Sequence, residues 1–340
     1  MVTIKDIAHA LGVSPSTVTR ALAGNNRISA ETIRRVRERA EAMGYVADSS
    51  ARAMQSGRSA LIGLLMPDIQ NNFYSTMART AAEHCRRMGF QMVLSVTEDD
   101  PVAEEEQIRA LVGARCAGAL IVPTAGISAT SCRLLASMPT VQLVRRSSIL
   151  QASGVGMNDR TALASACGYL LDLGHRRIGL LVGDDSLDTG RERKAGFIAA
   201  FRERGIEPDP GLIRAGSPRA GHGREATSGL LSATPVPSAI IAAGAALTEG
   251  MLDAVSERFG AATPTVSLLG FSDNPAFRWW RGGGLTTVSL PLSEVVATAS
   301  GLLFDSISAG VNTSGEHHFT TLETGLILRN STHPVKLKPA

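Results

Sequence analysis

The chain has 340 residues, of which 44% are hydrophobic and 19% are charged. This composition is typical of a soluble globular protein of two or three domains and excludes a disordered tail. No apolar run approaches the ~20 residues that cross a bilayer, and no apolar segment follows Lys5 and Asp6 as it would in a secretory signal. We therefore expect a cytoplasmic protein with no membrane partner.

Cysteine and histidine patterns give no sign of a metal centre. No C-x-x-C pair occurs among the four cysteines, which are Cys85, Cys116, Cys132 and Cys167. They predict isolated thiols in a reducing compartment, and neither a disulfide framework nor a zinc site. The adjacent histidines His317-His318 would point to opposite faces of a strand. We therefore expect no metal and no cofactor.

Positive charge is concentrated near the N-terminus. Residues 1–60 contain nine Lys or Arg against five Asp or Glu, a net charge of +4. The whole chain carries +3, so residues 61–340 sum to −1. A small basic segment on a near-neutral body predicts binding to a polyanion. The alternative is an ordinary solvated helix surface, which charge alone does not exclude.

Cap signals predict three short helices in this basic segment. Thr3, with an acid three residues on, fits a capping box, and Gly12 can end the first helix. Ser14 is a good N-cap for the second helix, with Pro15 in its first turn. A third helix starts at Ser29. Two short helices joined by a tight glycine turn predict a helix-turn-helix.

The start of the second helix presents short hydroxyls and one arginine between Pro15 and Arg20. Arginine can bond guanine O6 and N7 together, and serine or threonine can meet several base edges. Such a helix suits the major groove of DNA. A plain three-helix packing unit is the alternative, but the N-terminal position and the local charge favour DNA binding.

Short motifs follow one another in a characteristic order along the whole chain. At the head they are Thr3-Ile4-Lys5-Asp6-Ile7-Ala8, Gly12-Val13-Ser14, Thr17-Val18, Arg20 and Gly44-Tyr45. Further on they are Ser50-Ala51-Arg52-Ala53-Met54, Leu64-Leu65-Met66-Pro67-Asp68, Leu173-Gly174-His175-Arg176-Arg177, Ala195-Gly196-Phe197, Leu269-Gly270-Phe271 and Leu285-Thr286-Thr287-Val288. Together, over residues 2–330, they resemble the lactose-repressor (LacI/GalR) family.

This resemblance implies a DNA-binding head at residues 1–47, a hinge helix and linker at 48–59, and an effector-binding and dimerisation body at 60–332. In the family, two hinge helices pair in the minor groove, where an apolar side chain wedges between base steps, and Met54 occupies that position here. The DNA-binding positions that we expect are Thr3, Ser14, Pro15, Ser16, Thr17, Arg20, Arg27, Tyr45, Ala51 and Met54.

From residue 60 onward, short β-branched runs alternate with helical stretches. This alternation predicts parallel sheets with helices on both faces, and two such series predict two doubly wound subdomains. The fold class that we expect is α/β, with an all-α head and a body that the resemblance implies is periplasmic-binding-protein-like. The expected subdomains comprise residues 60–157 with 288–315, and 158–287 with 316–332.

Ligands of open α/β sheets bind at the carboxyl ends of the strands. The effector-binding candidates at these ends are Asn71, Phe73, Tyr74, Arg145, Arg146, Asn158, Arg191, Gly244, Ser272 and Asp273. The resemblance makes Arg191 the strongest candidate, since the family uses an arginine at this motif position to hold polar ligand groups. As alternatives, Phe73 and Tyr74 can begin a helix against the core, and Arg145 with Arg146 can be a solvated pair.

The chain departs from the family pattern at several of these candidates. Family members commonly carry Asn-Asp at Gly244-Ala245, an acid at Ser272, Asp-Arg at Arg145-Arg146 and Asp-Asn at Asn158-Asp159. Loss of two carboxylates and gain of an arginine makes the cleft less negative. We therefore expect an anionic ligand such as a sugar acid to fit better than a neutral polyol.

No P-loop, nucleophile elbow or H-E-x-x-H motif occurs, so we expect no enzyme. We expect a ligand-responsive, sequence-specific DNA-binding regulator, a repressor that binds a palindromic operator as a homodimer. A solute-binding protein without a DNA role is the alternative. The Trp279-Trp280 pair indicates a subunit interface or a cleft rim, and the tail from Asn330 lacks a heptad pattern, which predicts a dimer and no tetramer.

Overall fold

The computed structural model describes residues 2–22, 24–25, 27–45, 59–310 and 316–335. Contacts divide the chain into two compact units, Met1–Ser59, which includes the head, and Ala60–Ala340, which includes the body. Among the described helices, none is long and apolar enough to cross a membrane.

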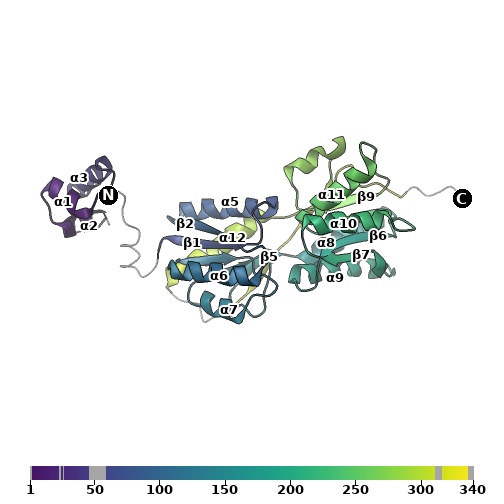
Figure 1. The fold of residues 1–340 in the computed structure, drawn as a ribbon, viewed down its shortest axis with the longest axis horizontal. Helices are drawn as coiled ribbons and strands as arrows, with labels where there is room; N and C mark the ends of the chain where they lie inside the picture. Colours follow the sequence, from purple (N-terminus) through teal and green to yellow (C-terminus); the bar gives the residue numbers. More distant parts are fainter. Residues whose placement is uncertain (1, 23, 26, 46–58, 311–315, 336–340) are drawn as a thin grey trace. The chain divides into compact units, whose positions relative to one another are not determined.

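Three short helices form the head: α1 (Ile4–Leu11), α2 (Pro15–Leu22) and α3 (Ala30–Ala42) (Figure 1). The predicted capping box is present, because the Thr3 N–H donates to Asp6 Oδ2 at 2.8 Å and the Asp6 N–H donates to Thr3 Oγ1 at 3.4 Å. These bonds satisfy backbone donors that the start of a helix leaves without partners. The core of the head consists of Ile7, Ala8, Val18, Ala21, Val36 and Ala40.

The first subdomain of the body is a six-stranded parallel sheet in the order β11–β5–β4–β3–β1–β2. The strands are β1 (Leu61–Met66), β2 (Gln91–Val96), β3 (Gly118–Ile121), β4 (Thr140–Leu143), β5 (Gly154–Met157) and β11 (Phe319–Leu322). One face is covered by α5 (Asn72–Arg87) and α12 (Leu292–Ala309). The other is covered by α6 (Pro101–Gly113) and α7 (Ala129–Leu135). Burial on both faces explains the nearly continuous apolar sequence of the central strands.

The second subdomain repeats this arrangement with the order β12–β10–β9–β8–β6–β7, in which only β12 runs antiparallel among the described strands. Its strands are β6 (Ile178–Gly183), β7 (Ile213–Gly216), β8 (Ala239–Ala242), β9 (Ser267–Phe271), β10 (Thr286–Ser289) and β12 (Gly325–Ile327). The helices α8 (Asp159–Asp172) and α9 (Asp188–Arg202) cover one face, and α10 (Ala220–Leu231) and α11 (Ala245–Phe259) cover the other (Figure 1). The predicted α/β fold class is confirmed.

Within the described residues, the chain passes between the two subdomains three times: after β5, after β10 and after β11. The sequence led us to place residues 316–332 in the second subdomain, and this is corrected for β11, which pairs in parallel with β5 of the first sheet. Glycines permit this pairing, since a Cβ at Gly154 would lie 2.5 Å from the ring of Phe319. Likewise β10 extends the second sheet to Ser289, two residues beyond the expected boundary.

Close helix packing in the second subdomain depends on Gly196 of α9. A Cβ at this position would lie 2.0 Å from the carbonyl oxygen of Arg160 on α8. We expect Gly196→Ala to destabilise the protein by about 1–3 kcal/mol, because the two helices must separate. Gly229→Ala on α10 is the matched control, with nothing within 4 Å of the added methyl, and should instead stabilise by about 0.5–1 kcal/mol. Urea unfolding midpoints that moved in the same direction would contradict this packing argument.

Candidate functional site

The exposed side of α2 carries the short polar side chains that the sequence predicted for contact with DNA. Val18 and Ala21 are fully buried, and they pack the opposite face of the helix against the rest of the head. Pro15, Ser16 and Arg20 lie exposed on the remaining surface. Ser14 caps the helix, since its Oγ accepts from the Thr17 N–H at 3.2 Å and lies 2.8 Å from Thr17 Oγ1. One face is thus anchored and the other is free to meet a partner.

Basic and polar side chains flank this face. Among the described residues, no carboxylate forms an ion pair with Arg20 or Arg27, so both guanidinium groups are available to an anionic partner. Thr3 is exposed but its hydroxyl is already bonded to Asp6 at 2.8 Å. Tyr45 packs partly buried against the head core. The expected hinge at 48–58, with Ala51 and Met54, lies outside the described residues.

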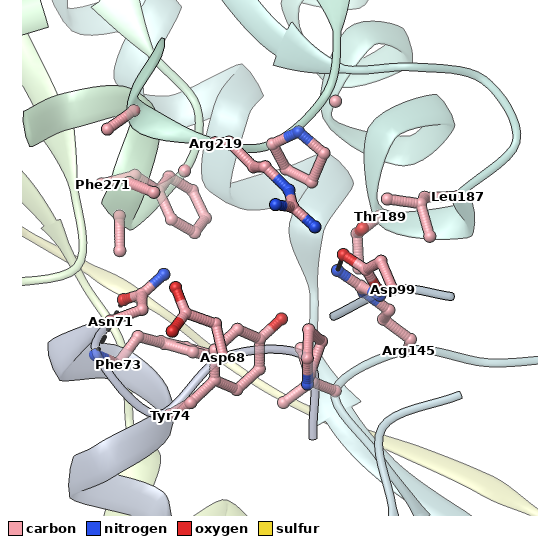
Figure 2. A pocket seen from close by; sticks show the side chains of 18 of the residues that line it. Asp68, Asn71, Phe73, Tyr74, Asp99, Arg145, Leu187, Thr189, Arg219 and Phe271 are labelled. Atoms are coloured by element: carbon pink, nitrogen blue, oxygen red, sulfur yellow. Dashed lines mark hydrogen bonds and ion pairs between the residues drawn. The ribbon is translucent and has the colours of Figure 1, made fainter. Parts of the chain in front are cut away.

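The main cleft lies between the carboxyl ends of the two sheets and encloses about 630 Å³. The first subdomain supplies the ends of β1, β2 and β4 and the start of α5, and the second supplies the starts of α9, α10 and α11. Figure 2 shows side chains from both subdomains converging on this space. The predicted candidates that line it are Asn71, Phe73, Tyr74, Arg145 and Gly244.

Aromatic rings form an apolar part of the cleft wall (Figure 2). Phe73 and Tyr74 meet edge to face, with ring centroids 4.9 Å apart, at the start of α5. Asn71 begins this helix, because its Oδ1 accepts from the Phe73 N–H at 3.0 Å. Burial raises the pKa of the Tyr74 hydroxyl, so the group stays protonated and neutral. Phe271, at the end of β9, lines the cleft from the second subdomain.

Two of the cleft arginines are neutralised by carboxylates. Arg145, only 5% exposed, forms a bidentate pair with Asp99. Arg193 donates from Nε to Asp159 at 2.7 Å and from Nη1 to the Ala243 carbonyl at 3.1 Å. These pairs hold planar guanidinium groups in fixed positions, where they retain hydrogen-bond donors without adding net positive charge.

Arg193 also supports an aromatic wall of the cleft. Its Cζ lies 4.2 Å from the ring centroid of Phe271, a cation–π arrangement. The side chain therefore contacts a carboxylate, a backbone carbonyl and an aromatic ring at once. A guanidinium constrained on these three sides is preorganised to meet a polar group in the cleft.

A third arginine, Arg219, enters the cleft from the second subdomain (Figure 2). Its Nη2 donates to the carbonyl oxygen of Glu98 at 2.6 Å, which links the two subdomains across the cleft. No carboxylate among the described residues forms an ion pair with Arg219. Asp68 lies on the opposite wall, and Glu249 lines the cleft with a pKa raised by burial and by the charges of Asp253 and Asp68.

Several predicted effector-binding residues lie outside the main cleft. Arg146, Asn158 and Arg191 line a second, separate cavity. Ser272 is buried, and its N–H donates to the Val288 carbonyl at 3.0 Å. Asp273 is held by Arg329 through bonds of 2.6 and 3.0 Å, so its carboxylate is already occupied. The structure therefore separates the ten candidates into those in the cleft, those in the second cavity, and Ser272 and Asp273, which line neither.

Of the arginines in this motif, Arg193 lines the main cleft, whereas the expected Arg191 lines the second cavity. Arg191 is exposed and donates to the Asp185 carbonyl at 2.7 Å. Sequence reasoning also missed Asp99 and Arg219. Asp99 follows the end of a predicted strand, a position that signals a ligand site in this fold class, whereas nothing in the sequence singled out Arg219.

No group of three or more His, Cys, Asp or Glu that could hold a metal ion occurs among the described residues. The four cysteines are reduced, and burial raises the pKa of the Cys167 thiol to about 12 and that of Cys85 to about 11. Thiols with such pKa values are protonated at neutral pH and are poor nucleophiles.

Comparison with known families and proteins gives matches to both units. Residues 3–48 match the family model described as bacterial regulatory proteins of the lacI family, and residues 167–332 match that of a periplasmic binding protein-like domain. The HTH-type transcriptional regulator DegA of Bacillus subtilis is 30% identical over 98% of this chain and 98% of its own. The HTH-type transcriptional repressor PurR of Pasteurella multocida is 26% identical over 97% of this chain and 98% of its own.

Solved structures share the fold. The lac repressor dimer bound to operator and the anti-inducer ONPF superposes with a TM-score of 0.83, covering 98% of this chain and 99% of that one. Its sequence is 22% identical, so this likeness shows the architecture alone. The similarity therefore includes both the head and the body.

Proposed function

Because this chain belongs to the LacI family of bacterial regulatory proteins and is a DNA-binding transcriptional regulator, we propose that it acts as an effector-responsive repressor. In this proposal the head reads a palindromic operator, the body binds a small metabolite in the main cleft, and two copies of the chain act together. The head is proposed to comprise residues 1–47, the hinge 48–59 and the body 60–332.

The observation that supports this proposal most strongly is the face of α2. Ser16 and Arg20 lie exposed on it, while Val18 and Ala21 anchor the opposite side. A solute-binding protein without a DNA role has no need of such a face. PurR, the similar protein described above, is named as a repressor, which supports repression here as well.

The effector that we propose is a small polar molecule with a flat or apolar side and an anionic group. The rings of Phe73, Tyr74 and Phe271 offer the surface for the apolar side, and Arg193 offers donors to a polar group. The anionic preference rests on Arg219, because Arg145 is neutralised by Asp99. A carboxylate near Arg219 would receive a charge-assisted bond.

A gel shift tests the whole proposal. The DNA is the segment that flanks the gene of this protein, and the competitor is random DNA of equal length and base composition. We expect a retarded complex that resists the competitor and that a subset of candidate sugar acids and other small carboxylates releases or strengthens. Equal affinity for both DNAs would contradict operator recognition, and a complex that no metabolite changes would contradict effector control.

We expect the protein to be a homodimer in solution, with Trp279 in the interface. This indole is 81% exposed and does not line the main cleft, and tryptophan is enriched in protein–protein interfaces relative to the rest of the surface. The similar lac repressor structure is of a dimer. Light scattering should give twice the mass of the chain, and Trp279→Ser should raise the dimer dissociation constant about tenfold or more. A stable tetramer, or a dimer unaffected by Trp279→Ser, would contradict this expectation.

A further inference from the structure

A second cavity lies beside the main cleft and encloses about 550 Å³. Val144, Arg145 and Leu187 line both spaces, so these three side chains form the wall between them. The remaining walls come from both subdomains, with Arg146 from the first and Arg191 from the second. The second cavity is therefore a separate space that both halves of the body complete.

Each carboxylate that lines the second cavity already has a partner. Asp159 accepts from Arg193 Nε at 2.7 Å. Glu192 accepts from Arg160 Nε at 2.8 Å. Asp188 accepts from the backbone N–H of Arg146 at 2.9 Å. Asp159 and Glu192 are thus neutralised by arginines, whereas Asp188 is held by backbone N–H groups and burial raises its pKa.

Two guanidinium groups of the same cavity are not held in an ion pair among the described residues. Arg191 donates to the Asp185 carbonyl at 2.7 Å, and Arg146 lies over the ring of Phe319 with its Cζ 6.0 Å from the centroid. Within the described part of the chain, neither forms an ion pair with a carboxylate. Further hydrogen-bonding groups of the lining are Thr124, Ser147, Ser148, Asn158, Ser186 and Thr321.

From this arrangement we propose that the second cavity is a binding site for a small dianion, either a phosphate ester or a dicarboxylate, held between Arg146 and Arg191. Two guanidinium groups match the two charges, because each can bond an oxyanion bidentately. The hydroxyls of Ser147, Ser148 and Thr321 can donate to the remaining oxygens, whereas those of Thr124 and Ser186 already donate to Glu104 and Asp184. This site is distinct from the main cleft, which Arg146 and Arg191 do not line.

Binding in the second cavity acts on the equilibrium between open and closed subdomains, as binding of the main-cleft effector does. Arg146 belongs to the first subdomain and Arg191 to the second, so a bridging dianion favours the closure state in which the two guanidinium groups are closest. The shared wall of Val144, Arg145 and Leu187 places the two ligands on either side of one set of side chains. The second site thus gives the regulator a second metabolic input, which is thermodynamically coupled to the first.

Calorimetric titration of the full-length protein tests the proposal, with inorganic phosphate and succinate as separate probes at constant ionic strength. We expect saturable binding of one probe per chain, and preference for phosphate or for succinate identifies the ester or the dicarboxylate. In Arg146→Gln/Arg191→Gln the affinity should fall about tenfold or more, since both charge-assisted bonds to the anion are lost. Thermal unfolding checks that this variant remains folded.

The matched control is Arg202→Gln/Arg214→Gln, which removes the same amount of charge from the body at positions that line neither cavity. It should bind the probes as wild type does. Equal losses in the two double variants would show general electrostatic attraction and overturn the proposal. If Arg219→Gln lost probe binding while Arg146→Gln/Arg191→Gln retained it, the anion would lie in the main cleft, and this result would also overturn the proposal. No saturable binding by the wild type would refute the site outright.

Discussion

In Arg193→Ala, the affinity for the effector should fall by a factor of tens to thousands. The affinity for the operator in the absence of effector should remain nearly unchanged. Truncating one partner of a buried charged hydrogen bond costs about 2–5 kcal/mol, and Arg193 is fixed by Asp159, the Ala243 carbonyl and the ring of Phe271. The measurement is calorimetry with the metabolite that changes the gel shift. In the repression assay, the same variant should respond only at much higher effector concentration.

Two further variants separate ligand binding from structural damage. Arg193→Lys keeps a positive charge beside the buried carboxylate of Asp159 but loses the planar fork, so it should fold normally and still bind the effector weakly. Arg191→Ala removes an exposed guanidinium that lies outside the main cleft, and it should bind this effector as wild type does. If Arg191→Ala proved the more damaging change, the effector would have to occupy the second cavity.

Arg20→Ala is the second large effect that we expect, a loss of about 1–3 kcal/mol in operator binding, because a good bidentate contact to a base has that value. Arg20 lies exposed near the end of α2 and forms no ion pair among the described residues of the head. Fluorescence anisotropy at fixed salt with operator and with random DNA measures both affinities. The affinity for the operator should fall much more than the affinity for random DNA.

The control for this prediction is Arg35→Ala, which removes the same charge from the exposed surface of α3. A phosphate contact contributes equally to every sequence, so any effect of Arg35→Ala should be similar on operator and random DNA and should reduce the salt dependence. If Arg20→Ala behaved in the same way, Arg20 would be a phosphate contact and its role in reading bases would be excluded.

The sequence predicted the elements that depend on local signals. Capping residues such as Thr3 and Ser14 act within three residues of chain, so the start of each head helix could be inferred. The sequence pointed to Arg191, whereas Arg193 lines the main cleft, because two residues turn a helix by about 200° and the two side chains point to different sides. The pair of Arg145 and Asp99 joins residues 46 positions apart, and no local pattern indicates it.

The position of β11 was missed for a similar reason. Its pairing with β5 depends on two glycines that make room for the ring of Phe319, at a separation of more than 160 residues. Short strands with few apolar residues carry a weak periodic signal. The fit between an aromatic ring and glycines on a distant strand can be recognised only once the fold has brought the two strands together.

The triple connection between the subdomains limits the ways in which the body can move. Two rigid units joined by one segment can swing and twist about many axes, whereas three connecting segments restrict their relative motion. A ligand in the cleft then acts on a restricted set of closure motions. The angle between the two subdomains is therefore the quantity through which a bound ligand acts on the rest of the chain.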